Sequence, residues 1–252
     1  MIGRLRELLT PQMVWLEPTN DCQLHCITCY RVGRKVGYMS EETFSNFRNN
    51  IPINVRAIAL NGAGEPLLHP KFAEMVDSLA SWRYRLSFST NGLLLDSDMQ
   101  DAIIDKVDWV NISIDGTAED YDMRRPGGNW DVLKNNADEI IDRKRKRTKI
   151  SVSLTRYNHS DEEVSTFKRA WRKADKVTIG EWHSSALQTG TSQTGKCDSL
   201  TNQKACMVLW NGDVTTCCWD LRGGNVCGNI NESKLGKIRR VPGSMCKTCV
   251  FG

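Results

Sequence analysis

Six short segments rich in β-branched or aromatic residues alternate with helix-like segments over the first part of the chain. Each apolar segment has the length of one strand. The predicted strands are 13–16, 55–60, 84–88, 109–114, 149–154 and 176–179. The predicted helices are 41–49, 70–82, 97–107, 130–143 and 161–174, the last with a capping box of Ser160 and Glu163. This alternation predicts an α/β fold with a parallel sheet, and six units predict a partial (β/α)6 barrel of the TIM type.

Polar segments that are often rich in glycine follow each of these predicted strands. In chain order they read EPTNDCQLHCITCY, NGAGEP, STNG, SIDG, TRYN and EWHS. Any one of them is also typical of an ordinary turn. Because the carboxyl ends of parallel strands meet at one edge, and ligands bind there, six such segments predict a functional site at that rim.

The chain of 252 residues contains ten cysteines and has a formal net charge of +4. It contains no run of 18 apolar residues, and its start lacks the apolar run and cleavage site of a secretion signal. We therefore expect a cytoplasmic location and no membrane partner. Since the cytosol keeps thiols reduced, metal binding or catalysis explains the cysteines better than disulfides do. The basic run 142–149 follows a predicted helix, where cations complement the dipole, so no nucleic-acid partner is expected.

Three of the cysteines form a C-x3-C-x2-C pattern directly after the first predicted strand: Cys22, Cys26 and Cys29. Three thiolates on a four-iron cluster leave one iron open to another ligand. A structural zinc site is the alternative, but it uses four ligands, and the fourth would have to come from His25 or from farther away. The position on the predicted rim favours an iron–sulfur cluster.

The segments CQLHCITCY, GAGEPLL, STNG and SIDG resemble those of the radical S-adenosylmethionine (SAM) superfamily. The resemblance implies that SAM binds the open iron through its amino and carboxylate groups. It also implies reductive cleavage of SAM to a 5'-deoxyadenosyl radical that abstracts a substrate hydrogen. A flavodoxin or a ferredoxin-type protein would supply the electron.

The resemblance further implies a set of contacts to SAM. The matching positions are Ala63, Gly64, Glu65 and Pro66 for the backbone near the amino group, and Ser89, Thr90, Asn91 and Ser113 for the ribose side. Tyr30 would approach the adenine. The carboxylate of SAM needs a cation or a donor, and Arg124, Arg125 or Arg156 could supply it through a bidentate contact. The sequence does not choose among these arginines.

The strand–helix rhythm stops after residue 182, and the polar stretch 187–196 is typical of a linker. We predict a core domain of residues 1–190 and a terminal domain of residues 191–252. The terminal domain carries seven of the ten cysteines. It is too small to depend on an apolar core alone, which favours a metal staple. Asn211-Gly212 predicts a hairpin turn, and a short helix is expected over 231–240.

Four cysteines of this terminal domain resemble the Twitch domain, a shortened relative of the SPASM domain. They are Cys197, Cys217, Cys246 and Cys249. The resemblance implies one auxiliary 4Fe–4S cluster in addition to the SAM-binding one, because the longer cysteine run of a full SPASM domain is absent. A structural zinc site is the alternative.

The remaining cysteines leave the ligand set open. Cys206 could replace Cys197, since both precede the same hairpin. Otherwise Cys206 and Cys227 are expected to be small buried apolar side chains. Cys218 is expected to share a strand with Cys217, so the two would point to opposite faces.

These features predict a radical SAM oxidoreductase in which the auxiliary cluster accepts an electron during a two-electron oxidation of a small molecule. Such an oxidation needs a base, for which the rim offers Glu181, His183 and Tyr157, and we prefer Glu181. The alternative is a maturase that modifies a ribosomally made peptide or a protein. An alternative of another class is an iron–sulfur electron carrier or a zinc-stapled binding protein. The segments GAGEP and STNG argue against that class, because a carrier has no use for a cofactor pocket.

Overall fold

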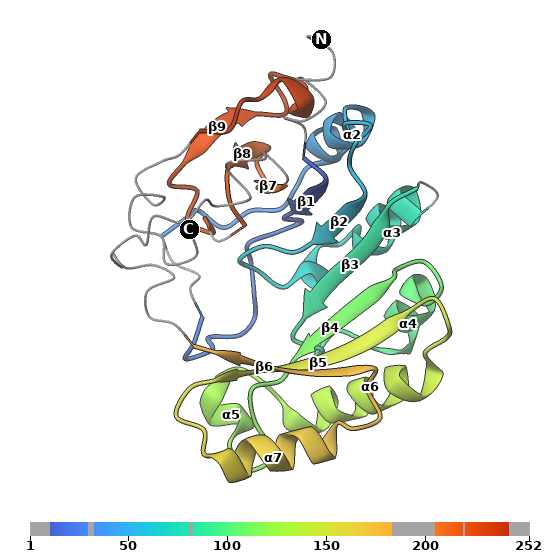
Figure 1. The fold of residues 1–252 in the computed structure, drawn as a ribbon, viewed down its shortest axis with the longest axis vertical. Helices are drawn as coiled ribbons and strands as arrows, with labels where there is room; N and C mark the ends of the chain where they lie inside the picture. Colours follow the sequence, from blue (N-terminus) through green and yellow to red (C-terminus); the bar gives the residue numbers. More distant parts are fainter. Residues whose placement is uncertain (1–10, 30–32, 81–82, 183–204, 219, 242–252) are drawn as a thin grey trace.

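The computed structural model describes residues 11–29, 33–80, 83–182, 205–218 and 220–241. These residues contain one nine-stranded sheet in the order β6-β5-β4-β3-β2-β1-β7-β8-β9 (Figure 1). The first six strands are β1 Met13–Leu16, β2 Ala57–Leu60, β3 Arg85–Thr90, β4 Trp109–Ser113, β5 Lys149–Arg156 and β6 Lys176–Glu181. Each is parallel to its neighbours among them, which confirms the predicted α/β fold. The described strands form an open, curved sheet.

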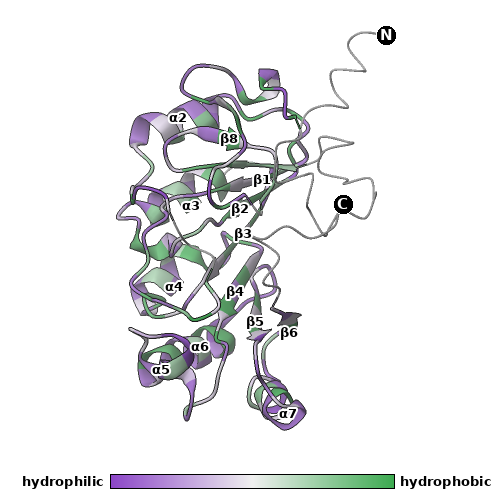
Figure 2. Ribbon diagram, turned by 90° about the vertical axis from the view of Figure 1, so that its left-hand side faces the viewer, coloured by the Kyte–Doolittle hydropathy of each residue, from purple (hydrophilic) through white to green (hydrophobic). Residues whose placement is uncertain are grey.

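Helices cover one face of this parallel sheet (Figure 2). They are α2 Glu41–Asn49, α3 Phe72–Ala80, α4 Ser97–Ile103, α5 Tyr121–Arg124, α6 Trp130–Arg143 and α7 Asp161–Ala170. The side chains of each strand alternate between the face covered by helices and the opposite face. In β3, Leu86 and Phe88 are buried in the hydrophobic core, whereas Ser87 and Ser89 alternate onto the other face and are partly exposed. We call the face opposite the helices the inner face.

Local signals explain where the helices begin and end. Ser160 and Glu163 form the predicted capping box of α7. The helix predicted over 70–82 is α3, Phe72–Ala80, and a short 3-10 helix that was not predicted, η1, Pro66–Leu68, precedes it. Helix α4 is shorter than predicted, and Asp105, just after its end, has a φ of 65° that a continuing right-handed helix does not allow.

The terminal segment continues the same sheet, which the sequence did not indicate. Strand β7, Ala205–Val208, pairs in parallel with β1. It forms the predicted hairpin with β8, Asp213–Thr215, and Gly212 in the turn has a φ of 89°. Strand β9, Val226–Asn229, then pairs antiparallel with β8. We call residues 205–218 and 220–241 the terminal lobe.

Two sequence predictions for this lobe are wrong. The helix expected over 231–240 is reduced to a single 3-10 turn, η3, Leu235–Lys237. Cys217 and Cys218 do not share a strand, because β8 ends at Thr215 and both cysteines lie in the segment that follows it.

None of the helices within the described residues is long and apolar enough to cross a membrane.

Candidate active site

The loop after β1 carries Cys22, Cys26 and Cys29. Cys22 and Cys26 are partly buried and Cys29 is exposed. Burial raises the pKa of the Cys26 thiol to about 11, while the nearby Arg125 guanidinium acts in the opposite direction. The Sγ of Cys22 lies 3.4 Å from the backbone N of Leu24 and 3.8 Å from the side-chain Nδ2 of Asn91, both of which can donate to sulfur. Such donors stabilise negative charge on a thiolate and tune a bound cluster.

The cysteine loop is fixed against the turn that follows α5. The N–H groups of His25 and Ile27 donate to the carbonyls of Pro126 and Arg124, at 2.9 and 3.0 Å. Gly127 has a φ of 90°, and a Cβ there would lie 2.8 Å from the carbonyl oxygen of Gln23. A glycine is therefore needed at this close approach. The loop is therefore held in position by backbone contacts.

The segments GAGEP and STNG meet through the buried carboxylate of Glu65. Its oxygens accept hydrogen bonds from Thr90 Oγ1 at 2.7 Å, Asn91 N at 2.6 Å and Leu67 N at 3.1 Å. Burial raises the pKa of Glu65 to about 7, although these hydrogen bonds favour the ionised form. The backbone of Gly64 also passes so close to Thr19 and its neighbours that a Cβ would lie 2.6 Å from the Thr19 carbonyl oxygen. Residues far apart in the sequence are thus joined at one rim.

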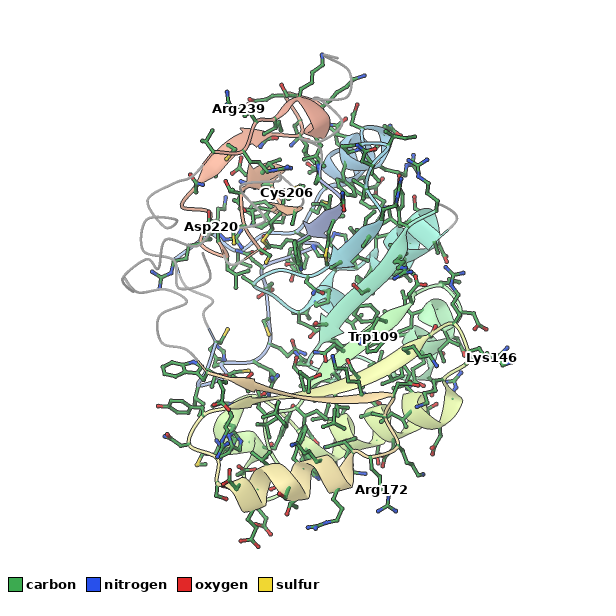
Figure 3. The ribbon with its side chains drawn as sticks, in the orientation of Figure 1. Trp109, Lys146, Arg172, Cys206, Asp220 and Arg239 are labelled. Atoms are coloured by element: carbon green, nitrogen blue, oxygen red, sulfur yellow. The ribbon has the colours of Figure 1, made fainter. Side chains whose placement is uncertain are left out.

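The inner face of β3 to β5 is polar and uncharged at its centre. Asn111 in β4 is hydrogen-bonded to two serines of β5. Its Oδ1 accepts from Ser151 Oγ at 2.9 Å and its Nδ2 donates to Ser153 Oγ at 3.0 Å. Trp109 Nε1 donates to Ser151 Oγ at 2.7 Å, and Ser113 Oγ lies 3.5 Å from Asn111 Nδ2. Figure 3 labels Trp109 on this part of the sheet. The predicted site residue Ser113 therefore belongs to a row of hydroxyl and amide groups.

The three candidate arginines occupy different environments. Arg125 is buried and pairs with the buried Asp115 at 2.6 Å, and its Nε has no hydrogen-bond partner among the described residues. Arg124 is held by Asp120 and by the Tyr157 carbonyl oxygen at 2.9 Å. Arg156 donates to Asp161 at 2.7 Å, at the beginning of α7. Against the larger effect of burial, the Arg125 guanidinium lowers the pKa of Cys26 through its charge, which links this arginine to the cysteine loop.

The predicted bases are only partly described. The ring of Tyr157 packs edge-on against Trp182 with 4.8 Å between centroids. Glu181 is exposed at the end of the edge strand β6. By strand alternation it shares a face with Val177 and Ile179, which pack against the core, and not with Gly180 on the inner face. Nothing in this placement brings Glu181 to the cysteine loop. His183 lies outside the described residues.

Several other predicted site residues also lie outside the described residues: Tyr30, Cys197, Cys246 and Cys249. Of the predicted auxiliary ligands, Cys217 is described and partly buried. Cys206 is fully buried in β7, and burial raises the pKa of its thiol to about 11 against the opposing effect of Arg240. Figure 3 labels Cys206 and Asp220 in the terminal lobe.

The chemistry of the first cysteine loop fits an iron–sulfur cluster. Among the described residues, no three His, Cys, Asp or Glu side chains are grouped to hold a single metal ion. A four-iron cluster binds its thiolates at separate irons, so they need not converge on one point. Three cysteines on one fixed loop, with donors aimed at Cys22 Sγ, would hold such a cluster.

Comparison with known proteins agrees with this geometry. A family model described as "Radical SAM superfamily" matches residues 16–170. The chain belongs to the radical SAM superfamily. A second model, described as "Iron-sulfur cluster-binding domain" and named SPASM, matches residues 197–249. Radical SAM and SPASM families imply SAM and iron–sulfur clusters as cofactors, and the chain is a radical SAM enzyme with a SPASM/Twitch-type domain.

Curated relatives of this radical SAM chain include enzymes of different kinds. It is 29% identical over 133 residues to the "Probable GTP 3',8-cyclase" of Methanococcus maripaludis, covering 50% of this chain and 44% of the relative. It is 31% identical over 159 residues to the "Mycofactocin maturase MftC" of Mycobacterium tuberculosis, covering 61% of this chain and 40% of the relative. The chain thus spans less than half the length of these relatives.

Solved structures share the fold of this radical SAM chain. SuiB of Streptococcus suis bound to S-adenosylmethionine has a TM-score of 0.73 at 14% identity, covering 98% of this chain and 75% of SuiB. The anSMEcpe enzyme with bound AdoMet has a TM-score of 0.69 at 16% identity, with coverages of 90% and 80%. BtrN in complex with AdoMet and 2-DOIA has a TM-score of 0.57 at 16% identity, with coverages of 90% and 81%. At these identities the likeness concerns the fold alone.

Four polar residues of the rim and the inner face were not singled out from the sequence: Glu17, Arg34, Asn111 and Asp115. Asp115 lies within SIDG, directly after β4, and Glu17 directly follows β1, so position after a strand was the available signal. Asn111 lies within a strand, and Arg34 lies in the loop beyond the cysteines. No local sequence pattern indicates a role for Asn111 or Arg34.

Proposed function

We propose that this radical SAM enzyme carries out a two-electron oxidation of a peptide or protein substrate. When bound, SAM and a cluster held by Cys22, Cys26 and Cys29 supply a 5'-deoxyadenosyl radical that abstracts a substrate hydrogen. The observation that carries the proposal is the junction at Glu65, which holds GAGEP and STNG together beside the cysteine loop. A flavodoxin or ferredoxin-type reductant and a cytoplasmic location belong to the same proposal.

Residues of the chain have distinct parts in this scheme. Ala63, Gly64 and Pro66 would offer backbone groups to the cofactor's amino group. Ser89, Thr90 and Asn91 would lie toward the ribose, and Tyr30 toward the adenine. Because Arg125 is buried and oriented by Asp115, we assign it to the carboxylate in preference to Arg156, which donates to Asp161 near the beginning of α7.

The preference for a peptide over a small molecule rests on two observations. The uncharged row around Asn111 offers hydroxyl and amide groups, which suit peptide amides better than charged metabolites. The relatives include a mycofactocin maturase, and the SuiB fold has been solved bound to the precursor peptide SuiA. A small-molecule dehydrogenase is the second candidate, and the fold likeness to BtrN in complex with 2-DOIA favours it.

The terminal lobe would hold the auxiliary 4Fe–4S cluster through Cys197, Cys217, Cys246 and Cys249. Four protein thiolates leave no open iron, which supports a role in electron transfer and not in binding substrate. The base remains a choice among Glu181, His183 and Tyr157. We retain Glu181 as the candidate, although its side chain must reach round the exposed end of β6.

The test separates formation of the 5'-deoxyadenosyl radical from conversion of the substrate. In the double variant Cys246→Ala/Cys249→Ala, reconstituted without oxygen, iron should fall from about eight to about four per chain. Formation of 5'-deoxyadenosine should continue, while conversion of peptides encoded beside the gene should stop. Cys227→Ser is the matched control and should keep both activities. Normal product formation by the double variant would show that the electron-transfer role is wrong.

A further inference from the structure

Glu17 directly follows β1 and is completely buried, at 0% exposure. Its carboxylate accepts hydrogen bonds from three separate parts of the chain. Arg34 donates two, from Nη2 at 2.5 Å and from Nη1 at 2.9 Å. The backbone N of Ala63 donates at 2.9 Å and that of Trp210 at 3.3 Å. Four donors satisfy the two oxygens, so this buried charge is fully compensated.

We call Glu17 and its four hydrogen-bond donors the Glu17 junction. Arg34 extends the Glu17 junction into the terminal lobe. Its Nε donates to the carbonyl oxygen of Leu221 at 2.7 Å. The two Nη groups of the guanidinium therefore bind Glu17, while its Nε binds the terminal lobe. A planar fork of this kind fixes direction as well as distance, which a lysine ammonium does not.

Two glycines allow the parts to approach this closely. A Cβ on Gly62 would lie 2.2 Å from Cγ of Glu17, and a Cβ on Gly37 would lie 2.4 Å from the ring of Trp210. Gly62 directly precedes Ala63, and Gly37 follows Arg34 in the same loop. A side chain at position 62 would displace Glu17, and a side chain at position 37 would displace Trp210.

A buried ion pair is a poor explanation for stability alone, because well-packed apolar residues of similar volume do as well or better. What the pair does fix is relative position. Ala63 begins the backbone segment that the proposed function places at the amino group of SAM. Small displacements of such positioning groups have large effects on binding and rate.

We infer that Glu17 is a positioning residue for SAM, and that it transmits the placement of the terminal lobe, through Arg34 and Trp210, to the backbone of Ala63. The inference rests on the proposed SAM site. It makes SAM binding depend on contacts from the terminal lobe that touch neither SAM nor the first cluster.

The main experiment compares Glu17→Gln with Glu41→Gln in protein reconstituted without oxygen. Glu41 pairs with Lys71 on the surface and serves as a control for loss of an ion pair. Glu17→Gln should raise the Kd for SAM, measured by equilibrium dialysis, about tenfold or more. Its iron content should match the wild type. Hydrogen exchange should become faster in peptides spanning 59–66 and 207–214, whereas Glu41→Gln should change none of these quantities.

A second variant acts from the side of the terminal lobe. Gly37→Ala displaces Trp210 without altering Glu17 or Ala63, so it should raise the Kd in the same direction. In the double variant Glu17→Gln/Gly37→Ala the two effects should be clearly less than additive, since both act through one junction. If Glu17→Gln fails to fold, Arg34→Lys replaces it, and its Kd should lie above that of the wild type.

Two results would overturn the inference. One is a Kd for SAM within about twofold of the wild type in folded Glu17→Gln or Arg34→Lys protein, even with a lowered Tm. The other is full additivity of the two substitutions. A wild type that binds SAM but forms no 5'-deoxyadenosine would refute the proposed function and leave the positioning role supported by the binding data.

Discussion

The parallel part of the sheet, β1 to β6, and the terminal lobe differ in how they exclude water. The parallel part buries one face beneath helices, with Leu86, Phe88 and Ile112 almost completely inaccessible. In the described terminal lobe the only helical element is η3, and the buried strand β7 lies between β1 and β8.

Beyond the buried side chains of Val208, Val214 and Ile230, polar contacts also hold the terminal lobe together. Asp220 accepts from the N–H groups of Gly224 and Asn225, both at 2.8 Å, and the Asn225 amide donates to Thr216 Oγ1 at 2.9 Å. Each such bond contributes only about 0.5–1.5 kcal/mol net. We therefore expect the lobe to depend more than the parallel part on docking against the sheet and on its proposed cluster.

The largest expected effect is a loss of activity on substitution in the cysteine loop after β1, and not in the terminal lobe. Cys26→Ala should lower 5'-deoxyadenosine formation more than about 1,000-fold, because the first cluster loses a thiolate. Chromatography of the quenched reaction measures this, and Cys227→Ser in the lobe is the control. Residual activity within tenfold of the wild type would contradict the assignment of the first cluster to this loop.

The next effect is on stability in the parallel part. Asp115→Asn leaves the buried Arg125 without its carboxylate, which should cost about 3–5 kcal/mol of unfolding free energy. Urea unfolding of the protein without cofactors measures it, with the exposed pair of Lys134 and Asp138 as control through Asp138→Asn. A loss below about 1 kcal/mol would show that Asp115 is not the group that balances Arg125.

A smaller and local effect is expected in the terminal lobe. Asp220→Ala removes the acceptor for two N–H groups and should cost about 1–3 kcal/mol. Hydrogen exchange should accelerate in 213–229 but not in β3 to β5. If protection falls equally in both regions, the two form one cooperative unit and the contrast between them is wrong.

The last effect concerns pH and again the parallel part. Because burial raises the pKa of Glu65 to about 7 from its ordinary 4.5, its contribution to stability is complete below pH 4.5 and is lost as the pH rises to about 7. Urea midpoints at pH 5 and pH 8 should therefore differ less in Glu65→Gln than in the wild type. The exposed Glu42→Gln should keep the wild-type difference, and an unchanged difference in Glu65→Gln would refute the pKa shift.

The sequence predicted what local patterns determine. Strand–helix alternation, the cap at Ser160 and the Asn211-Gly212 turn all match the structure, because each depends on neighbouring residues. The parallel pairing of β7 with β1 was not predicted, since the pairing partner is about 190 residues away and leaves no local signal. Arg34 was missed for the same reason, because its role exists only when distant segments meet, whereas the signal for Glu17 was its position directly after a strand.

One measurement tests the central claim most directly. The protein is purified without oxygen, reconstituted with iron and sulfide, and given SAM and a strong reductant. Formation of 5'-deoxyadenosine, together with loss of that product in Cys26→Ala, is the predicted result. No 5'-deoxyadenosine from a preparation with its full complement of iron would contradict the account of this chain as an active radical SAM enzyme.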